Sequence, residues 1–237
     1  MTLQIGRTLS RGLARAASFS GAALLLLTLS VQFVVLGSVN SLIRSALPSE
    51  LRAVETGLAL PVPEDAAVAI VIVGGLLGVV TSVVGPRALA RDRSELNSLP
   101  ESLATRRIGR ATLSALVAGV IVTVSVMLGS LLIVPGLFLA TSFLFVNFAV
   151  AVEDARALPA LRRSWGLVAG DRWRVFALVF LAAVAFGVVN VATGLASLVD
   201  LAAAQAFNVV VSSGLVVAYL GVAAEAFRRL RGDAERP

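Results

Sequence analysis

The sequence of 237 residues contains no cysteine, no histidine and no lysine. Without cysteine the chain has no disulfide, no thiol nucleophile and no thiolate ligand for a metal. Without histidine it lacks the commonest general base and the commonest metal ligand, so catalysis by Ser–His or Cys–His pairs is excluded. No pair of carboxylates lies within the long apolar segments. We therefore expect a protein that is not an enzyme and has no catalytic residue, metal site or cofactor site.

Charge is also scarce. Charged residues make up 14% of the chain and hydrophobic residues 58%, and the mean hydropathy is +0.94. Soluble domains carry about a quarter of charged residues, so this chain has too little polar surface to cover a soluble fold. The charged residues also gather in short stretches between long apolar blocks. This distribution indicates an integral membrane protein.

The net charge of +6 and the pI near 11.4 raise the question of a nucleic-acid partner. The arginines flank apolar blocks and have no accompanying aromatic platform. Basic residues beside membrane spans are better explained by topology and by attraction to anionic lipid. We therefore expect membrane lipids with anionic head groups as partners, and no nucleic acid.

Six blocks are long and apolar enough to cross a bilayer, which requires about 20 residues. The blocks are 19–43, 66–84, 111–134, 136–152, 175–199 and 201–227. Residues 111–152 are too long for one span, since a helix rises about 1.5 Å per residue, so we predict a turn at Pro135–Gly136. A second turn is expected near Asp200. The prediction is an all-α bundle of six transmembrane helices in one membrane domain, followed by a short tail, 228–237.

The arginines are distributed unequally between the segments that join these blocks. Eighteen lie in the N-terminal tail, after the second block, after the fourth block and in the C-terminal tail, and only Arg44 and Arg52 lie elsewhere. Cytoplasmic segments carry the excess of basic residues in membrane proteins. We therefore predict a multi-pass protein of the cell membrane with both termini in the cytoplasm.

The cytoplasmic segments are expected to form amphipathic interfacial helices. Arg7, Arg11 and Arg15 recur on one helical face with apolar residues opposite, which predicts a basic helix lying on the membrane. The segment 98–101 reads as a capping box that opens a helix running straight into the third span. Glu225 is expected to form an ion pair with an arginine at 228 or 229.

Small and polar residues within the predicted spans have two interpretations each. Gly74 and Gly78 form a GxxxG spacing, which favours close helix packing within the chain or in a dimer. Four polar side chains lie inside spans: Gln32, Asn147, Asn190 and Asn208. They either line a pathway or, more commonly, form hydrogen bonds with neighbouring helices.

The stretch 131–178 contains the most distinctive pattern. Its members are a Pro-Gly pair (Pro135, Gly136), an acidic pair (Glu153, Asp154), an Ala-Leu-x-x-Ser-Trp motif (Ala160, Leu161, Ser164, Trp165), and Gly170, Trp173 and Arg174. This pattern resembles a group of uncharacterised prokaryotic six-span membrane proteins. The group is related to the membrane domain beside glycerophosphodiester phosphodiesterases and to the YciC-like membrane proteins, and the opening LQIGRTLSRGL is similar to halophilic-archaeal members. The resemblance implies six spans and no activity, because the phosphodiesterase chemistry belongs to a separate soluble domain.

The segment between the fourth and fifth spans is the candidate interaction segment on the cytoplasmic side. Its candidate residues are Glu153, Asp154, Arg162, Arg163, Trp165 and Trp173. The two carboxylates are expected to pair with arginines such as Arg156 or Arg106. The segment is then either a fixed hairpin with satisfied charges or a docking site for a partner.

Two functional classes follow from these patterns. The first is a non-enzymatic scaffold, regulator or lipid-organising protein that acts through its basic cytoplasmic face, with a membrane protein or a second copy as a further partner. The alternative is a transporter or channel for a small or lipidic solute. Ion-coupled transport is disfavoured, because such proteins keep ionisable residues within the membrane and the spans contain almost none.

Overall fold

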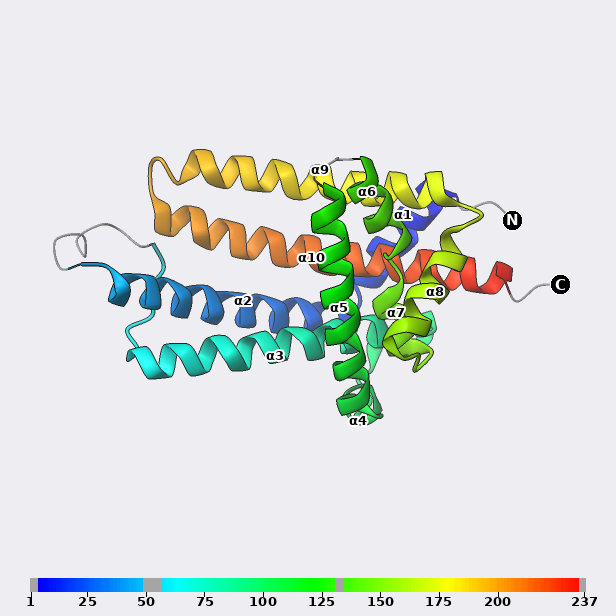
Figure 1. The fold of residues 1–237 in the computed structure, drawn as a ribbon, viewed down its shortest axis with the longest axis horizontal. Helices are drawn as coiled ribbons and strands as arrows, with labels where there is room; N and C mark the ends of the chain where they lie inside the picture. The colour runs from blue at the N-terminus through cyan, green and yellow to red at the C-terminus, as the bar shows by residue number, and fades with distance from the viewer. Residues whose placement is uncertain (1–3, 49–56, 131–133, 235–237) are drawn as a thin grey trace. The chain divides into compact units, whose positions relative to one another are not determined.

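The computed structural model describes residues 4–48, 57–130 and 134–234. Every regular element in these ranges is helical, and six helical stretches are long and apolar enough to cross a membrane (Figure 1). Five of them are single helices, and the sixth is the stretch Pro135–Val152. The elements are α1 (Ile5–Ala16), α2 (Phe19–Ala46), α3 (Glu64–Leu89), the 3-10 helix η2 (Arg93–Asn97), α4 (Ser102–Thr105), α5 (Ile108–Ser130), α6 (Val134–Ser142), α7 (Val146–Val152), α8 (Ala157–Val168), α9 (Arg172–Ala196) and α10 (Leu201–Ala234). The predicted fold class is confirmed.

The chain divides into two compact units. Unit 1 contains residues 1–24, 79–183 and 217–237, and unit 2 contains residues 25–78 and 184–216. Four long helices, α2, α3, α9 and α10, contribute one part to each unit.

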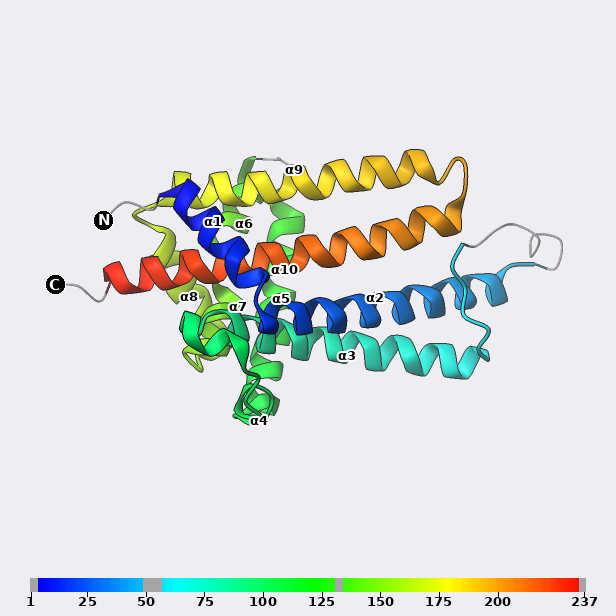
Figure 2. The same cartoon turned by 180° about the vertical axis from the view of Figure 1, so that it is seen from behind.

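Unit 2 contains two helical pairs, α2 with α3 and α9 with α10, which lie side by side in both ribbon views (Figures 1 and 2). Gly74 sits at a close approach within this unit, because a β-carbon there would come 2.2 Å from Cγ2 of Val35. Gly78 has open space around the same position. Of the two glycines in the GxxxG spacing, only Gly74 therefore takes part in close packing among the described residues.

Within unit 2, side-chain amides of α2 and α10 hold the segment before α3. Oε1 of Gln205 accepts a hydrogen bond from the backbone N–H of Leu58 and another from Nδ2 of Asn40, each at 2.8 Å. Asn40 also donates to the carbonyl of Leu58, at 2.9 Å. Gly57 has a φ of 73° and lies against the Gln205 amide, so a side chain there would meet both a steric and a conformational barrier.

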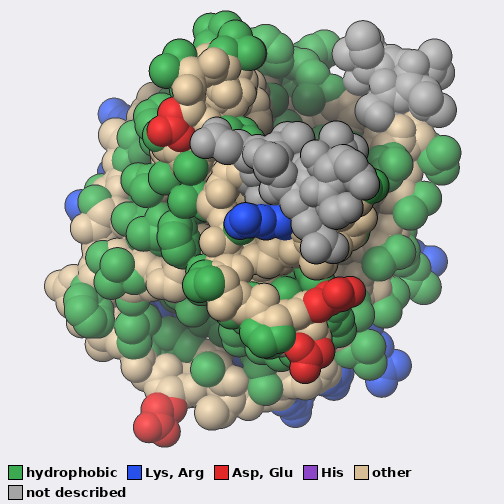
Figure 3. Space-filling view, turned by 90° about the vertical axis from the view of Figure 1, so that its left-hand side faces the viewer, with side chains coloured by type: hydrophobic (Ala, Val, Ile, Leu, Met, Phe, Trp, Pro, Cys, Tyr) green, Lys and Arg blue, Asp and Glu red, His purple; other side chains and the backbone are tan. Residues whose placement is uncertain are grey.

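The turn between α9 and α10 lies near Asp200, as the sequence predicted. Oδ1 of Asp200 accepts a hydrogen bond from the N–H of Ala203 at 2.8 Å, which caps the start of α10. Leu198 and Val199 are almost fully exposed in this turn. Apolar side chains are prominent on this face, with a few acidic groups among them (Figure 3).

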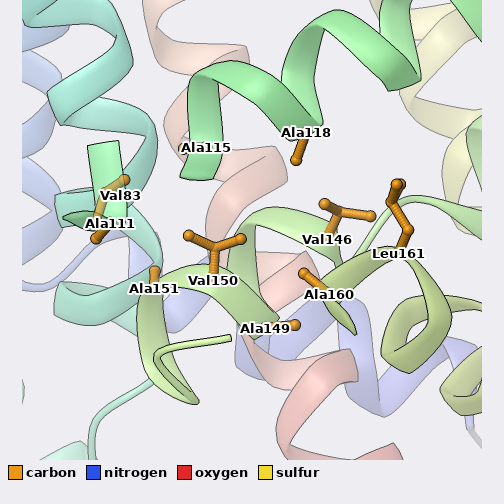
Figure 4. Packing of buried hydrophobic residues seen from close by; sticks show 10 residues of the cluster. All are labelled: Val83, Ala111, Ala115, Ala118, Val146, Ala149, Val150, Ala151, Ala160 and Leu161. Carbon is orange, nitrogen blue, oxygen red and sulfur yellow. The ribbon is translucent and has the colours of Figure 1, made fainter. Parts of the chain in front are cut away.

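The core of unit 1 is built on small residues. Ala111, Ala115 and Ala118 recur at i, i+4 and i+7 on α5 and are all buried. Figure 4 shows them beside Val146 and Val150 of α7. Because alanine side chains are short, α7 approaches α5 closely, and α8 packs on both helices.

The fourth predicted span is not one continuous helix. Residues 143–145 form a turn between α6 and α7. Ser164 of α8 is buried against this break: its hydroxyl donates to the carbonyl of Ser142 at 2.8 Å and accepts from the N–H of Phe145 at 3.1 Å. The Ser of the Ala-Leu-x-x-Ser-Trp motif thus satisfies backbone groups that a helix would have paired.

Three boundaries differ from the sequence-based expectations. Pro135 and Gly136 lie in the first turn of α6 rather than in a turn between helices, which suits a proline because the first turn needs no backbone donor there. The helix after the expected capping box is only α4, since Arg107 has a φ of 46° and separates it from α5. Residues 228–234, expected as a tail, continue α10.

Candidate functional site

The charged residues of the structure are concentrated in unit 1. Its described part contains 17 arginines and eight acidic residues, whereas Arg44 is the sole arginine described in unit 2. Unit 1 therefore has a large excess of positive charge, and the pairing of its carboxylates determines which arginines remain available to a ligand.

The first buried contact joins the first helix of the chain, α1, to the last, α10. Nε of Arg15 in α1 donates to Glu225 of α10 at 2.9 Å, and both side chains are 8% exposed. Arg229, one turn beyond Glu225, donates to the second carboxylate oxygen at 2.9 Å. The expected partner at 229 is therefore present, but Arg15, 210 residues away, is the buried partner.

The position of Arg15 corrects the expected orientation of α1. The buried residues of this helix are Thr8, Gly12 and Arg15, so Arg15 does not share the exposed basic face of Arg7 and Arg11. Because Gly12 has no side chain, α1 can lie close to α10. A β-carbon on Gly12 would lie 2.4 Å from the Cα of Val222 in α10. The helix is thus held by a glycine contact and a buried ion pair.

Arginines also cap the C-terminal end of α3. Nη1 of Arg15 donates to the carbonyls of Leu89 and Arg91, at 3.0 and 2.7 Å. Nη1 of Arg228 donates to the carbonyl of Ala90 at 2.8 Å. These carbonyls have no partner within the helix, and the negative end of the helix dipole favours cations there.

The second buried contact is centred on Arg87 of α3, whose side chain is 6% exposed. Its guanidinium donates to the carbonyls of Ala151, Leu103 and Arg106, at 2.8, 3.2 and 2.9 Å. It also lies 3.5 Å from Oδ1 of Asp154. One side chain therefore joins α3, α4 and the end of α7.

The acidic pair after α7 is fully engaged. Asp154 pairs with Arg106 at 2.6 Å, as the sequence suggested, and its φ of 52° turns the chain there. Glu153 pairs with Arg163 of α8 at 3.0 Å, and Arg231 of α10 lies 3.7 Å away. The acidic pair therefore fixes the hairpin internally.

The two tryptophans have different surroundings. Trp165 packs edge-on against Phe138 of α6, with ring centroids 5.6 Å apart, and the guanidinium of Arg172 lies 5.0 Å from the Trp165 ring centroid. Trp173 is 83% exposed and contacts Phe176. Trp165 is thus part of the packing of α6 on α8, whereas Trp173 presents its ring outward.

The polar residues within the spans do not gather into one group. Gln32 accepts a hydrogen bond from Ser212 at 3.2 Å, and Asn208 donates to Thr193 at 3.0 Å. Asn190 donates to the carbonyl of Phe186 in its own helix. These three lie in unit 2, whereas Asn147 lies in unit 1 and its side chain makes no hydrogen bond with a described residue.

Two adjoining cavities in unit 1 have several charged residues in their lining. The first, of about 440 Å³, is lined by Arg11, Arg15, Asp92, Arg93, Glu225, Arg228 and Arg229. The second, of about 580 Å³, shares Asp92 and Arg228 with the first and also includes Arg87, Arg91 and Arg106. The hydrogen bond from Arg228, together with its positive charge, lowers the pKa of Asp92, which therefore stays ionised at neutral pH.

Several arginines remain without a partner once these contacts are counted. Six exposed guanidinium groups of unit 1 make no hydrogen bond, ion pair or ring contact with any residue in 4–48, 57–130 or 134–234: Arg7, Arg11, Arg93, Arg107, Arg156 and Arg162. Among the described residues, no group of three or more carboxylates is arranged to hold a metal ion. The chemistry that the arrangement offers is therefore the binding of anions.

Comparison with protein families gives one result. A family model described as a domain of unknown function, DUF7847, matches residues 3–230. No curated protein and no solved structure matches the chain.

Proposed function

The chain therefore belongs to this family of unknown function, and we propose that it is a non-enzymatic multi-pass protein of the cell membrane that binds and organises anionic lipid through unit 1. The six membrane-capable helices supply the membrane setting. The relation to the membrane domain beside glycerophosphodiester phosphodiesterases stays a prediction, as does docking of a membrane-protein partner or a second copy.

The six unpaired arginines carry this proposal. Buried arginines such as Arg15 and Arg87 are saturated by carboxylates and carbonyls and hold the fold together. The six others are exposed and have no partner among the described residues, so they can meet phosphate groups at the membrane surface. Each basic residue near an anionic membrane surface contributes about 1 kcal/mol of attraction.

The sidedness of the chain is testable by labelling. Because the protein has no native cysteine, Val199→Cys and Thr105→Cys each create one thiol. In intact cells, an impermeant maleimide is expected to label the variant at 199, which lies in the α9–α10 turn, and to label the variant at 105 only after permeabilisation. The cysteine-free parent is the blank. The opposite pattern would place the termini outside and overturn the orientation.

Lipid preference tests the function directly. We expect spin-labelled phosphatidylglycerol to associate with the reconstituted protein several-fold more than spin-labelled phosphatidylcholine, measured as the motionally restricted fraction. The preference should fall as salt rises, because exposed charges are screened. Replacing Arg107, Arg156 and Arg162 together with glutamine should lower it, whereas Arg44→Gln, in unit 2, should not. Equal association of the two lipids at low salt would contradict the proposal.

The alternative of solute transport receives less support. The polar groups of Gln32, Asn190 and Asn208 are used in hydrogen bonds with neighbouring or local backbone and side-chain groups. Such bonds contribute about 0.6 kcal/mol each to helix association. No feature of the described residues favours a pathway through them.

A further inference from the structure

We propose that the 440 Å³ cavity formed by α1, η2 and the end of α10 is a specific site for a phosphate group, with Arg11 and Arg93 as its ligand-binding residues and Asp92 as an internal competitor. This inference deepens the proposed function by naming a discrete site, and it rests on that function for the lipid source of the phosphate. All of the elements concerned belong to unit 1.

The charge balance of the cavity leaves it positive. Its lining is entirely charged, with five arginines and two carboxylates. Glu225 is neutralised by Arg15 and Arg229, at 2.9 Å each, and Asp92 by Arg228. Arg11 and Arg93 then remain without a counter-charge among the described residues, so a bound anion would balance the excess positive charge of the cavity.

The fixed and the free arginines have different roles. Arg15 is held on three sides, by Glu225 and by the carbonyls of Leu89 and Arg91. Arg15 lines the cavity and contributes positive potential, but its guanidinium donors are already used in these hydrogen bonds. Arg11 projects from α1 and Arg93 begins η2, so two exposed guanidinium groups from separate elements border the same space.

This chemistry selects phosphate over a neutral solute. A guanidinium group presents a planar fork of donors that matches two oxygens of a phosphate, and two such forks match its charge. Pockets for neutral ligands are lined mainly by apolar and aromatic residues, whereas every residue that lines this cavity is charged. The phosphate belongs either to a lipid head group or to a free phosphate-bearing solute.

The carboxylate of Asp92 already binds Arg228, which a phosphate oxygen could otherwise bind. The side chain of Asp92 is 71% exposed. A phosphate entering the cavity must compete with that carboxylate for Arg228. Removing the negative charge at Asp92 should therefore strengthen phosphate binding, which is the reverse of what loss of a purely structural ion pair would cause.

The experiment measures binding by calorimetry to the full chain purified in a neutral detergent. Inorganic phosphate and a water-soluble, short-chain phosphatidic acid are the two probes. Replacing Arg11 and Arg93 together with glutamine is expected to weaken binding at least ~10-fold, and Asp92→Asn to tighten it about threefold. The control is Arg44→Gln, which removes an exposed arginine of unit 2 that lies outside the cavity and should change binding less than ~2-fold.

Both probes binding with this pattern would support a site for free or lipid phosphate, and phosphatidic acid alone would support a head-group site. The inference is overturned if the Arg11/Arg93 variant binds like the parent, if the control loses as much, or if Asp92→Asn weakens binding. Thermal melting of each variant shows whether it is folded. A preference for anionic lipid that persists while the cavity pattern fails would leave the proposed function standing without this site.

Discussion

Replacing Glu225 with glutamine is expected to lower the free energy of unfolding by about 3–5 kcal/mol. The guanidinium of Arg15 would remain buried without its carboxylate, since both side chains are only 8% exposed. The loss would also weaken the attachment of α1 to α10, which includes the close contact of Gly12 with Val222. The measurement is unfolding in mixed micelles of increasing dodecyl sulfate content, followed by tryptophan fluorescence.

Two comparisons separate the buried pair from charge in general. Arg229→Gln removes the more exposed partner of the same carboxylate and should cost less than ~1 kcal/mol. Combining Glu225→Gln with Arg15→Met should cost less than the two single changes added together, because no buried charge is left unpaired. Unfolding of Glu225→Gln at the parental detergent fraction would show that the pair is not buried in the membrane-embedded protein.

Arg87→Leu is expected to have an effect of similar size, about 3–4 kcal/mol. The change leaves the carbonyls of Ala151, Leu103 and Arg106 without their donor and removes the positive charge beside Asp154. Because these groups belong to two separate segments that Arg87 joins to α3, the hairpin that follows α7 should loosen. Hydrogen exchange of residues 146–168 should rise together with the fall in stability.

Arg106→Gln is the control for Arg87. It removes the other partner of Asp154, but the side chain of Arg106 is 63% exposed, so the cost should stay below ~1 kcal/mol. Arg87→Lys should give an intermediate result, because an ammonium group keeps the charge but cannot match the planar fork of donors. Equal stability of Arg87→Leu and Arg106→Gln would refute the central role of Arg87.

The spanning helices could be predicted because their signal is local. A long run without charge must be helical in lipid, where each backbone group needs a partner within its own segment, and Asp200 marks the α9–α10 turn by capping the next helix. The pairing of Asp154 with Arg106 could also be suggested from sequence, because both residues lie on the same predicted side. These features depend on composition and on neighbours along the chain.

The features that were missed depend on contacts between distant segments. Arg15 follows the same four-residue spacing as Arg7 and Arg11, and nothing local distinguishes the buried arginine from the exposed ones. The break at residues 143–145 contains neither proline nor glycine, and it exists because Ser164 of another helix accepts and donates the missing backbone hydrogen bonds. Ser164 belongs to a motif that is recognisable in the sequence. Its contact with the break between α6 and α7 could be identified only from the structure.

The amide contacts of unit 2 were missed for a related reason. Asn40 and Gln205 lie near the ends of apolar blocks, where a polar side chain is unremarkable. Their shared contact with Leu58 becomes visible only when α2 and α10 are placed antiparallel, which the bond between Gln32 and Ser212 also requires. Sequence gives the helices of such a bundle more readily than their register.

The bond between Arg15 and Glu225 also sets an order of events during synthesis. The two residues are 210 positions apart, so a ribosome adding about 5–20 residues per second makes the arginine roughly 10–40 s before its carboxylate. Throughout that interval α1 has no partner from α10. During this time the apolar face of α1, with Ile5, Leu9 and Leu13, can bind to the lipid surface. The contact between the N-terminal helix and α10 therefore forms late, although the helix is made first.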